Sequence, residues 1–339
     1  MLPPGDQELF EALTGGAGER QRRAVAKAIT LIESTRPEHA ARAEALLAVL
    51  PVPARPTLRL GVSGVPGVGK STFVETLGLQ LVGRGHRVAV LAVDPSSSVS
   101  GGSILGDKTR MERLSVQPNA FVRPSPSRGT LGGVAAATRE AIRVVEAAGY
   151  DVVVVETVGV GQSEAAVAAI TDVFVLLQLP NAGDELQAIK KGVMELADLV
   201  VVNKADLDPD AAARAVGQLR SAVSSSGRHG GSAPAAEVLA TSALDPVAVD
   251  AVWQAIEAYR AAAAAGDGIA ARRRAQGRTW LWQRIDDGLQ RAFRADAEVQ
   301  RRLPGVLDAV DHGQLSPSTA ARRLLDAFDY RRDSAPGHE

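Results

Sequence analysis

The sequence predicts an α/β protein in which helices flank a mainly parallel sheet, with a helical segment before this region and a helical extension after it. Two observations predict this. Short β-branched apolar runs alternate with helix-like segments up to about residue 263, as in strands joined by crossover helices. Apolar residues also recur at helical spacing over residues 6–50 and again after residue 266. We therefore expect three parts, residues 1–52, 53–265 and 266–339.

Seven strands are expected in the central part. Each is a run of four to seven mostly apolar residues, as strands covered on both faces should be. The runs span residues 58–63, 87–93, 120–123, 151–156, 173–179, 199–203 and 237–241. Their alternation with helices predicts the parallel arrangement.

The helical parts show spacing and capping signals. Ala24, Ala28 and Leu31 recur at helical spacing before the sheet. Near the end of the chain, Ser316 and Ser318 stand where they can cap a final helix. These signals predict helices without indicating any chemistry.

Composition argues against several classes of function. The chain has 38 Lys and Arg against 39 Asp and Glu, a formal net charge of −1, so no overall field favours nucleic acid or an anionic membrane. The consecutive Arg272, Arg273 and Arg274 are expected to form a solvated helix face. Cysteine is absent, which excludes disulfides and thiol catalysis. Without a targeting signal or a long apolar run, we expect a cytoplasmic protein.

The strongest chemical signal is GVPGVGKST, residues 64–72, which follows a predicted strand and opens a predicted helix. In such a P-loop, glycines let backbone N–H groups approach phosphate oxygens, and the helix dipole favours the anion. Lys70 is expected to reach the β and γ phosphates and act in catalysis, and the Ser71 hydroxyl to ligate Mg²⁺. The nucleotide ligands expected here are Gly67, Val68, Gly69, Lys70, Ser71 and Thr72.

A second motif indicates guanine. The stretch VVVNKADL places Asn203, Lys204 and Asp206 directly after a predicted strand, at the sheet edge where open α/β sheets bind ligands. It resembles the Asn-Lys-x-Asp signature of GTPases, which implies that Asp206 accepts hydrogen bonds from guanine N1 and N2 and that Lys204 lies along the base. Ser242 and Ala243 resemble the companion motif whose backbone contacts guanine O6. The expected ligands are GTP and GDP.

A third element, ETVGVGQSE, is expected to contact the metal ion and the γ phosphate. Glu156 ends a predicted strand, and its carboxylate is expected to hold Mg²⁺ directly or through water. Gly159 can donate its N–H to the γ phosphate, so this loop would relax when the phosphate leaves. Asp94 and Asp107 are further candidate metal ligands, with a helix cap or a turn as the alternative for each.

These motifs, together with SILGDKTRM and NAGDELQAIKKG, resemble in order and spacing the MeaB/ArgK family, the GTPase chaperones of adenosylcobalamin-dependent acyl-CoA mutases. The resemblance covers essentially the whole chain. It implies a P-loop GTPase domain whose slow, partner-stimulated GTP hydrolysis gates loading and protection of the mutase's cobalamin. Methylmalonyl-CoA mutase is the usual partner. We expect cobalamin to be held only by that partner, because no histidine here lies in a recognisable cobalamin-ligand motif.

The segment NAGDELQAIKKG permits two interpretations. It could form the start of a helix over residues 185–197 with Asp184 near its cap. In the resembling family it behaves instead as an additional switch. The switch interpretation makes Gln162 and Lys190 candidates for aligning the attacking water or offsetting phosphate charge.

The position of this segment depends on the order of the strands. We expect the strand over residues 173–179 to have the strands leading to Glu156 and Asn203 among its neighbours. The segment would then emerge on the nucleotide side of the sheet.

The helical extension carries an apolar face. From Leu281, the residues Ile285, Leu289 and Phe293 keep mostly to one side of the predicted helix. The family resemblance favours a homodimer built with this extension, and packing on the chain's own GTPase domain is the alternative.

Two other functional classes stay open. A nickel-delivery GTPase would ordinarily show a His-rich or Cys-containing metal site, and the sequence has neither. A P-loop kinase usually uses ATP, and the NKAD motif argues against ATP.

Overall fold

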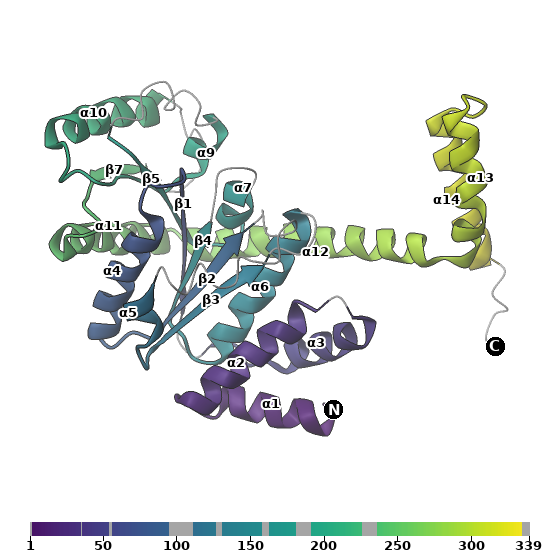
Figure 1. The fold of residues 1–339 in the computed structure, drawn as a ribbon, viewed down its shortest axis with the longest axis horizontal. Helices are drawn as coiled ribbons and strands as arrows, with labels where there is room; N and C mark the ends of the chain where they lie inside the picture. Colours follow the sequence, from purple (N-terminus) through teal and green to yellow (C-terminus); the bar gives the residue numbers. More distant parts are fainter. Residues whose placement is uncertain are drawn as a thin grey trace. The chain divides into compact units, whose positions relative to one another are not determined.

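The computed structural model describes residues 2–34, 36–53, 56–94, 111–126, 131–157, 163–180, 191–225 and 236–333. It divides the chain into two compact units, Met1–Arg273 and Arg274–Glu339. The first unit contains a seven-stranded parallel sheet with helices on both faces (Figure 1), which confirms the predicted fold class. None of the described helices combines the length and apolarity needed to cross a membrane.

All seven predicted strands form, and no end differs from its prediction by more than three residues. The strands are β1 (Leu58–Gly64), β2 (Val88–Asp94), β3 (Ala120–Pro126), β4 (Val152–Thr157), β5 (Val173–Gln178), β6 (Leu199–Val202) and β7 (Glu237–Ala240). The helices of the first unit are α1 (Pro4–Thr14), α2 (Glu19–Ile32), α3 (Pro37–Val49), α4 (Lys70–Gly83), α5 (Glu112–Ser115), α6 (Leu131–Ala147), α7 (Ser163–Ala168), α9 (Lys191–Leu196), α10 (Pro209–Ser225) and α11 (Pro246–Ala265). Helix α12 (Gly268–Ala295) begins in the first unit and continues into the second, which also contains α13 (Ala297–Asp311) and α14 (Pro317–Asp333).

The strand order is β3-β2-β4-β1-β5-β6-β7. The expected neighbour of β5 that leads to Asn203 is confirmed, because β6 pairs with β5. The other expectation is wrong, because β4, which carries Glu156, is separated from β5 by β1. The strand that leads into the P-loop therefore occupies the centre of the sheet.

Successive side chains of the central strands point alternately into two hydrophobic cores, one on each face of the sheet. In β5, Val173 and Val175 face the core that contains Phe73 of α4 and Trp253 of α11. Phe174 between them faces the core on the opposite side of the sheet, which is shared with α6, α10 and the N-terminal helices. Burial on both faces explains why these strands are continuous apolar runs.

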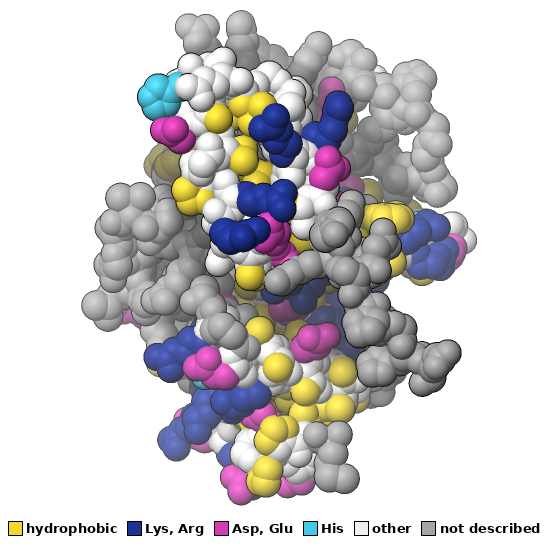
Figure 2. Space-filling view, turned by 90° about the vertical axis from the view of Figure 1, so that its right-hand side faces the viewer, with side chains coloured by type: hydrophobic (Ala, Val, Ile, Leu, Met, Phe, Trp, Pro, Cys, Tyr) yellow, Lys and Arg dark blue, Asp and Glu magenta, His cyan; other side chains and the backbone are white. Residues whose placement is uncertain are grey.

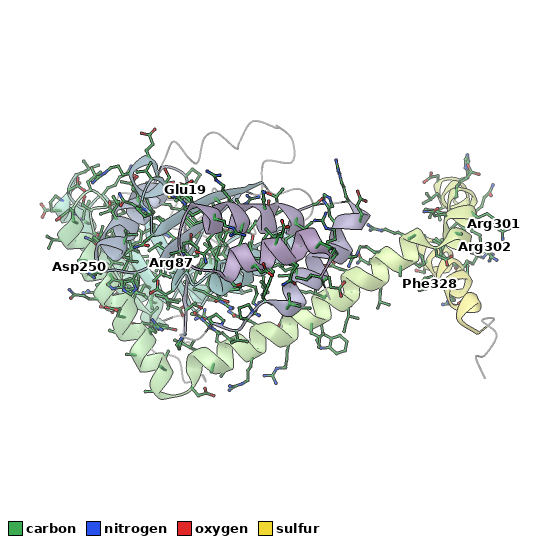
Figure 3. All side chains as sticks on the ribbon, turned by 90° about the horizontal axis from the view of Figure 1, so that it is seen from below. Glu19, Arg87, Asp250, Arg301, Arg302 and Phe328 are labelled. Carbon is green, nitrogen blue, oxygen red and sulfur yellow. The ribbon has the colours of Figure 1, made fainter. Side chains whose placement is uncertain are left out.

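The N-terminal helices are fastened to the sheet through polar contacts as well as apolar ones. The Gln21 amide nitrogen donates to the Leu13 and Ala148 carbonyl oxygens at 2.7 and 2.9 Å. Arg87, labelled in Figure 3, donates to the Gln21 amide oxygen at 2.6 Å and lies over the Tyr150 ring at 4.5 Å. Helix α2 thus joins the same core as the sheet.

Two buried aspartates hold the start of α12 against the amino ends of the strands. Asp172 precedes β5 and Asp198 precedes β6, and each is 1% exposed. Arg273 makes a two-pronged contact with Asp172, with Nε donating to Oδ1 at 2.7 Å and Nη2 to Oδ2 at 2.5 Å. Arg272 Nη1 and the Tyr259 hydroxyl donate to Asp198 at 2.8 and 2.7 Å. The predicted solvated arginine face is therefore wrong for Arg272 and Arg273, because partners distant in sequence bind them.

In the second unit, α13 and α14 pack against each other. Phe293, near the end of α12, also contacts α14, because its ring meets the Phe328 ring edge to face with 5.6 Å between the centroids, and Figure 3 labels Phe328. Ser316 caps α14 as predicted, because its hydroxyl accepts from the Thr319 N–H at 3.2 Å, whereas Ser318 lies inside the helix. Figure 2 shows side chains of both charge signs interspersed with hydrophobic ones, as a near-zero net charge leads one to expect.

The aspartate clamp generates a stability prediction. Arg273→Met removes the charge opposite a buried carboxylate, so we expect the free energy of unfolding in urea to fall by about 3 kcal/mol. Arg278→Met, on an exposed position of the same helix, is the matched control and should change it by less than about 0.5 kcal/mol. Equal losses in the two variants would contradict the clamp.

Candidate functional site

The P-loop joins β1 to α4, and its conformation requires glycine at three positions. Gly64, Gly67 and Gly69 have φ values of 149°, 76° and 96°, a region that side chains rarely adopt. A Cβ on Gly64 would also lie 2.4 Å from the Leu177 carbonyl oxygen of β5. Val68, by contrast, is fully buried in the core and anchors the loop. The loop thus ends at the first turn of α4, a helix N-terminus of the kind that binds phosphate.

The side chain of Lys70 lies inside this loop. Its ammonium donates to the Gly64 and Val65 carbonyl oxygens at 2.7 and 3.1 Å, and the residue is only 7% exposed. A buried charge held by loop carbonyls lies close to where P-loop phosphates bind. Thr72, another predicted ligand, lies half-buried in the same first turn of α4.

Ser71 and Glu156, which the sequence predicts as metal ligands, contact each other. The Ser71 hydroxyl donates to Glu156 Oε1 at 2.8 Å, and Glu156 is 3% exposed at the end of β4. A hydroxyl and a carboxylate beside the P-loop are hard oxygen donors of the type Mg²⁺ prefers, so these residues fit the ion. Asp94 ends the adjacent strand β2, one position past the residue paired with Thr157. Asp107 lies outside the described residues.

Asn203 ties the phosphate loop to the base-side loops. Its amide nitrogen donates to the Val68 carbonyl oxygen at 2.7 Å, and its amide oxygen accepts from the Ala243 N–H at 2.8 Å. A Cβ on Gly69 would lie 2.6 Å from that amide nitrogen, so the close approach also depends on glycine. The hydroxyl of Thr76 on α4 adds a bond to the Ala243 carbonyl oxygen at 2.7 Å. The sequence motif identified Asn203 but gave no signal for Thr76, whose partner lies far along the chain.

The predicted base-side residues lie together on the loops after β6 and β7. Lys204 has a positive φ of 61°, an uncommon conformation for a side chain of this size. The next residue, Ala205, holds this loop beside the end of β7, because its N–H donates to the Thr241 carbonyl oxygen at 3.0 Å. Asp206 is exposed, while Ser242 and Ala243 are buried. An exposed carboxylate next to two buried backbone segments is a suitable arrangement for recognising a base edge.

Three predicted residues, Gly159, Gln162 and Lys190, lie outside the described residues, as does the segment 181–190. Of the alternative helix over residues 185–197, the described part is α9, which begins at Lys191. The last residue of β5, Gln178, is 1% exposed, and neither polar atom of its amide has a hydrogen-bond partner among the residues that the structure describes. Sequence reasoning missed it, because it looked like an ordinary end of an apolar strand.

Comparison with known proteins agrees with this geometry. Residues 25–298 match the family described as methylmalonyl Co-A mutase-associated GTPase MeaB. The chain belongs to the MeaB family. It is therefore a GTPase, and a guanine nucleotide is its ligand.

Other members are similar to this MeaB-family chain over nearly its whole length. A Caulobacter vibrioides protein is 52% identical over 97% of this chain and 99% of its own. GTPase ArgK of Escherichia coli is 44% identical over 90% and 92% of the two chains, and the mitochondrial methylmalonic aciduria type A homolog of Mus musculus is 42% identical over 97% and 82%. The crystal structure of a protein named LAO/AO transport system kinase superposes with a TM-score of 0.73 at 36% identity, covering 97% of this chain and 99% of that one.

The geometry of Lys70 predicts the effect of removing it. Lys70→Ala deletes the buried cation that offsets phosphate charge, so we expect GTP turnover to fall by about 10²-fold or more. Lys27→Ala, an exposed lysine on α2, is the matched control and should leave turnover unchanged. Phosphate release at saturating GTP is the measurement, and wild-type turnover in Lys70→Ala would remove Lys70 from the site.

Proposed function

We propose that this GTPase gates the loading and protection of the cobalamin cofactor of an acyl-CoA mutase, with methylmalonyl-CoA mutase as the partner. The observation that carries the proposal is the match of residues 25–298 to a family described by its association with that mutase. The mouse relative, named for methylmalonic aciduria, supports the same metabolic setting. The chain itself would hold only the nucleotide and its metal ion.

The phosphate side of the site supports hydrolysis by positioning and charge. Backbone N–H groups of the P-loop and the Lys70 ammonium bind the β and γ phosphates in this proposal. Ser71 and Glu156 are the residues that would hold Mg²⁺, with Asp94 and Asp107 as further candidates. When bound, the ion offsets negative charge on the phosphates.

The base side supports selection of guanine. The exposed Asp206 carboxylate has two acceptor oxygens, which can accept from N1–H and the N2 amino group of guanine. Adenine has neither of these donors. Asn203 fixes this loop to the P-loop by its two hydrogen bonds, so base and phosphates are bound by one connected unit. The same tether makes phosphate contacts sensitive to the base.

The partner is proposed to complete catalysis. Gln162 and Lys190 are the candidates for aligning water or offsetting phosphate charge, and the docked mutase is proposed to position them. Hydrolysis by the chain alone should then be slow, and docking of the mutase should accelerate it.

A turnover experiment tests this. We expect methylmalonyl-CoA mutase to raise GTP turnover of the wild-type chain by about tenfold or more. Three variants should lose most of that stimulation: Gln162→Ala, Lys190→Ala and Gln187→Ala, the last in the segment NAGDELQAIKKG. Gln218→Ala, on an exposed position of α10, is the control. The switch interpretation fails if the mutase stimulates all three variants as fully as wild type, and the mutase assignment fails if the wild type is not stimulated.

We also propose that the second unit mediates a homodimer. Helix α12 contains no buried residue, and four large apolar side chains lie exposed on it. They are Leu281, Trp282, Ile285 and Leu289, exposed by 57%, 65%, 39% and 48%. Three of them recur every four residues, which is the spacing of a helix face that packs on another helix.

Light scattering checks the dimer. At micromolar concentration we expect twice the chain mass of 35.3 kDa, and the mass of one chain when Leu281, Ile285 and Leu289 are all replaced by Glu. Val116→Glu changes a 71% exposed apolar residue of the first unit and should leave the dimer intact. A wild-type chain that scatters as a monomer would refute the proposal.

A further inference from the structure

A groove of about 1360 Å³ lies on the N-terminal helices, away from the nucleotide loops at the carboxyl edge of the sheet. Helices α1, α2 and α3 and the edge strand β3 form its walls (Figure 1). Apolar side chains contribute to the lining, among them Leu9, Ala12, Ala24, Leu31, Phe121 and Val122. Proposed hydrolysis and base recognition use none of these residues, and the family match begins only at residue 25, inside α2.

Charged side chains also line this groove, and most of them are paired. The pairs are Arg42 with Asp6 at 2.7 Å, Arg23 with Glu19 at 3.1 Å and Arg123 with Glu33 at 2.5 Å. Asp6 is 1% exposed, and its hydrogen bonds from the Arg42 guanidinium lower the pKa of its carboxyl below the ordinary value. The acids of all three pairs already have an arginine of this chain as their partner.

Three cations lining the groove are left over. These exposed cations, which have no side-chain partner among the described residues, are Arg20, Lys27 and Arg36. Among the lining acids of the described chain, only Glu8 likewise lacks a side-chain partner. Arg20 and Lys27 are seven residues apart, so they lie on one face of α2, whose first residue, Glu19, is labelled in Figure 3. With Glu8 counted against the three cations, these side chains leave the groove with an excess of two positive charges.

We propose that the groove binds an acidic amphipathic segment of a partner protein. Carboxylates of the segment would pair with Arg20, Lys27 and Arg36, and its apolar side chains would cover the apolar lining. A simple anion would use the cations and leave the half-buried Leu9, Ala12 and Val122 uncovered, so the combination favours a peptide. The 14 residues of α2 span about 21 Å, which is room for a helical segment of about four turns.

Fluorescence anisotropy on the full chain tests the proposal with a defined probe. The probe is a fluorescein-labelled peptide of about 14 residues made of two Glu-Leu-Glu-Glu-Leu-Leu-Glu repeats, which place the leucines on one helical face, and two comparison peptides replace every Glu by Lys or every Leu by Ser. We expect the acidic probe to bind, and the simultaneous changes Arg20→Glu, Lys27→Glu and Arg36→Glu to weaken its binding by about tenfold or more. The control carries Arg113→Glu, Arg214→Glu and Arg322→Glu, which are exposed arginines elsewhere with the same charge change, and it should bind the probe as wild type does.

The outcomes separate the alternatives. Equal weakening in the control would mean that net charge alone governs binding, and equal binding of the Leu-to-Ser peptide would reduce the groove to a plain anion site; either result overturns the proposal. Unchanged binding after the groove substitutions overturns it as well. Because all six positions are exposed, both variants should fold, and GTP turnover of each should match wild type whether or not the mutase proposal holds.

Discussion

Two hydrogen bonds from one buried side chain hold the nucleotide site together. Asn203 joins the P-loop at Val68 to the loop after β7 at Ala243, and it is itself 1% exposed. Together with the bond from Thr76 of α4 to the Ala243 carbonyl oxygen, it ties the P-loop region to the loop after β7. The close contact also explains Gly69, since any side chain there would collide with the Asn203 amide.

The two edges of the sheet are built for different purposes. At the amino edge, Asp172 and Asp198 are fully bonded to arginines, a tyrosine and backbone N–H groups, so this edge is fixed. At the carboxyl edge, Lys204 adopts a rarely populated backbone conformation, and the buried Gln178 amide has no hydrogen-bond partner in the described part of the chain. Unfavourable features of this kind persist where function requires them, and here they surround the nucleotide loops. The aspartate contacts and the candidate nucleotide loops thus lie at opposite ends of the same strands.

Much of the fold and site was predictable because local physics determined it. Strands buried on both faces must be continuous apolar runs, and all seven were found within three residues of their observed ends. The phosphate loop needs positive φ at Gly67 and Gly69 and a helix directly after it. Glycines at fixed spacing before a helix can be recognised in the sequence. Ser71 and Glu156 were each predicted as metal ligands, and the hydrogen bond between them places both beside the P-loop.

By itself, then, the sequence determined the class of fold, the family and the kind of nucleotide, because each depends on residues close together in the chain. Tertiary structure alone decided which distant residues meet. Arg273 looked like part of a solvated run, yet it binds Asp172, 101 residues away, and no local signal distinguishes a paired arginine from a free one. The order of strands placed β1 between β4 and β5 for the same reason. The groove beside α2 likewise exists only because three helices and an edge strand pack together, and within the described ranges Arg20 and Lys27 on its rim have no side-chain partner.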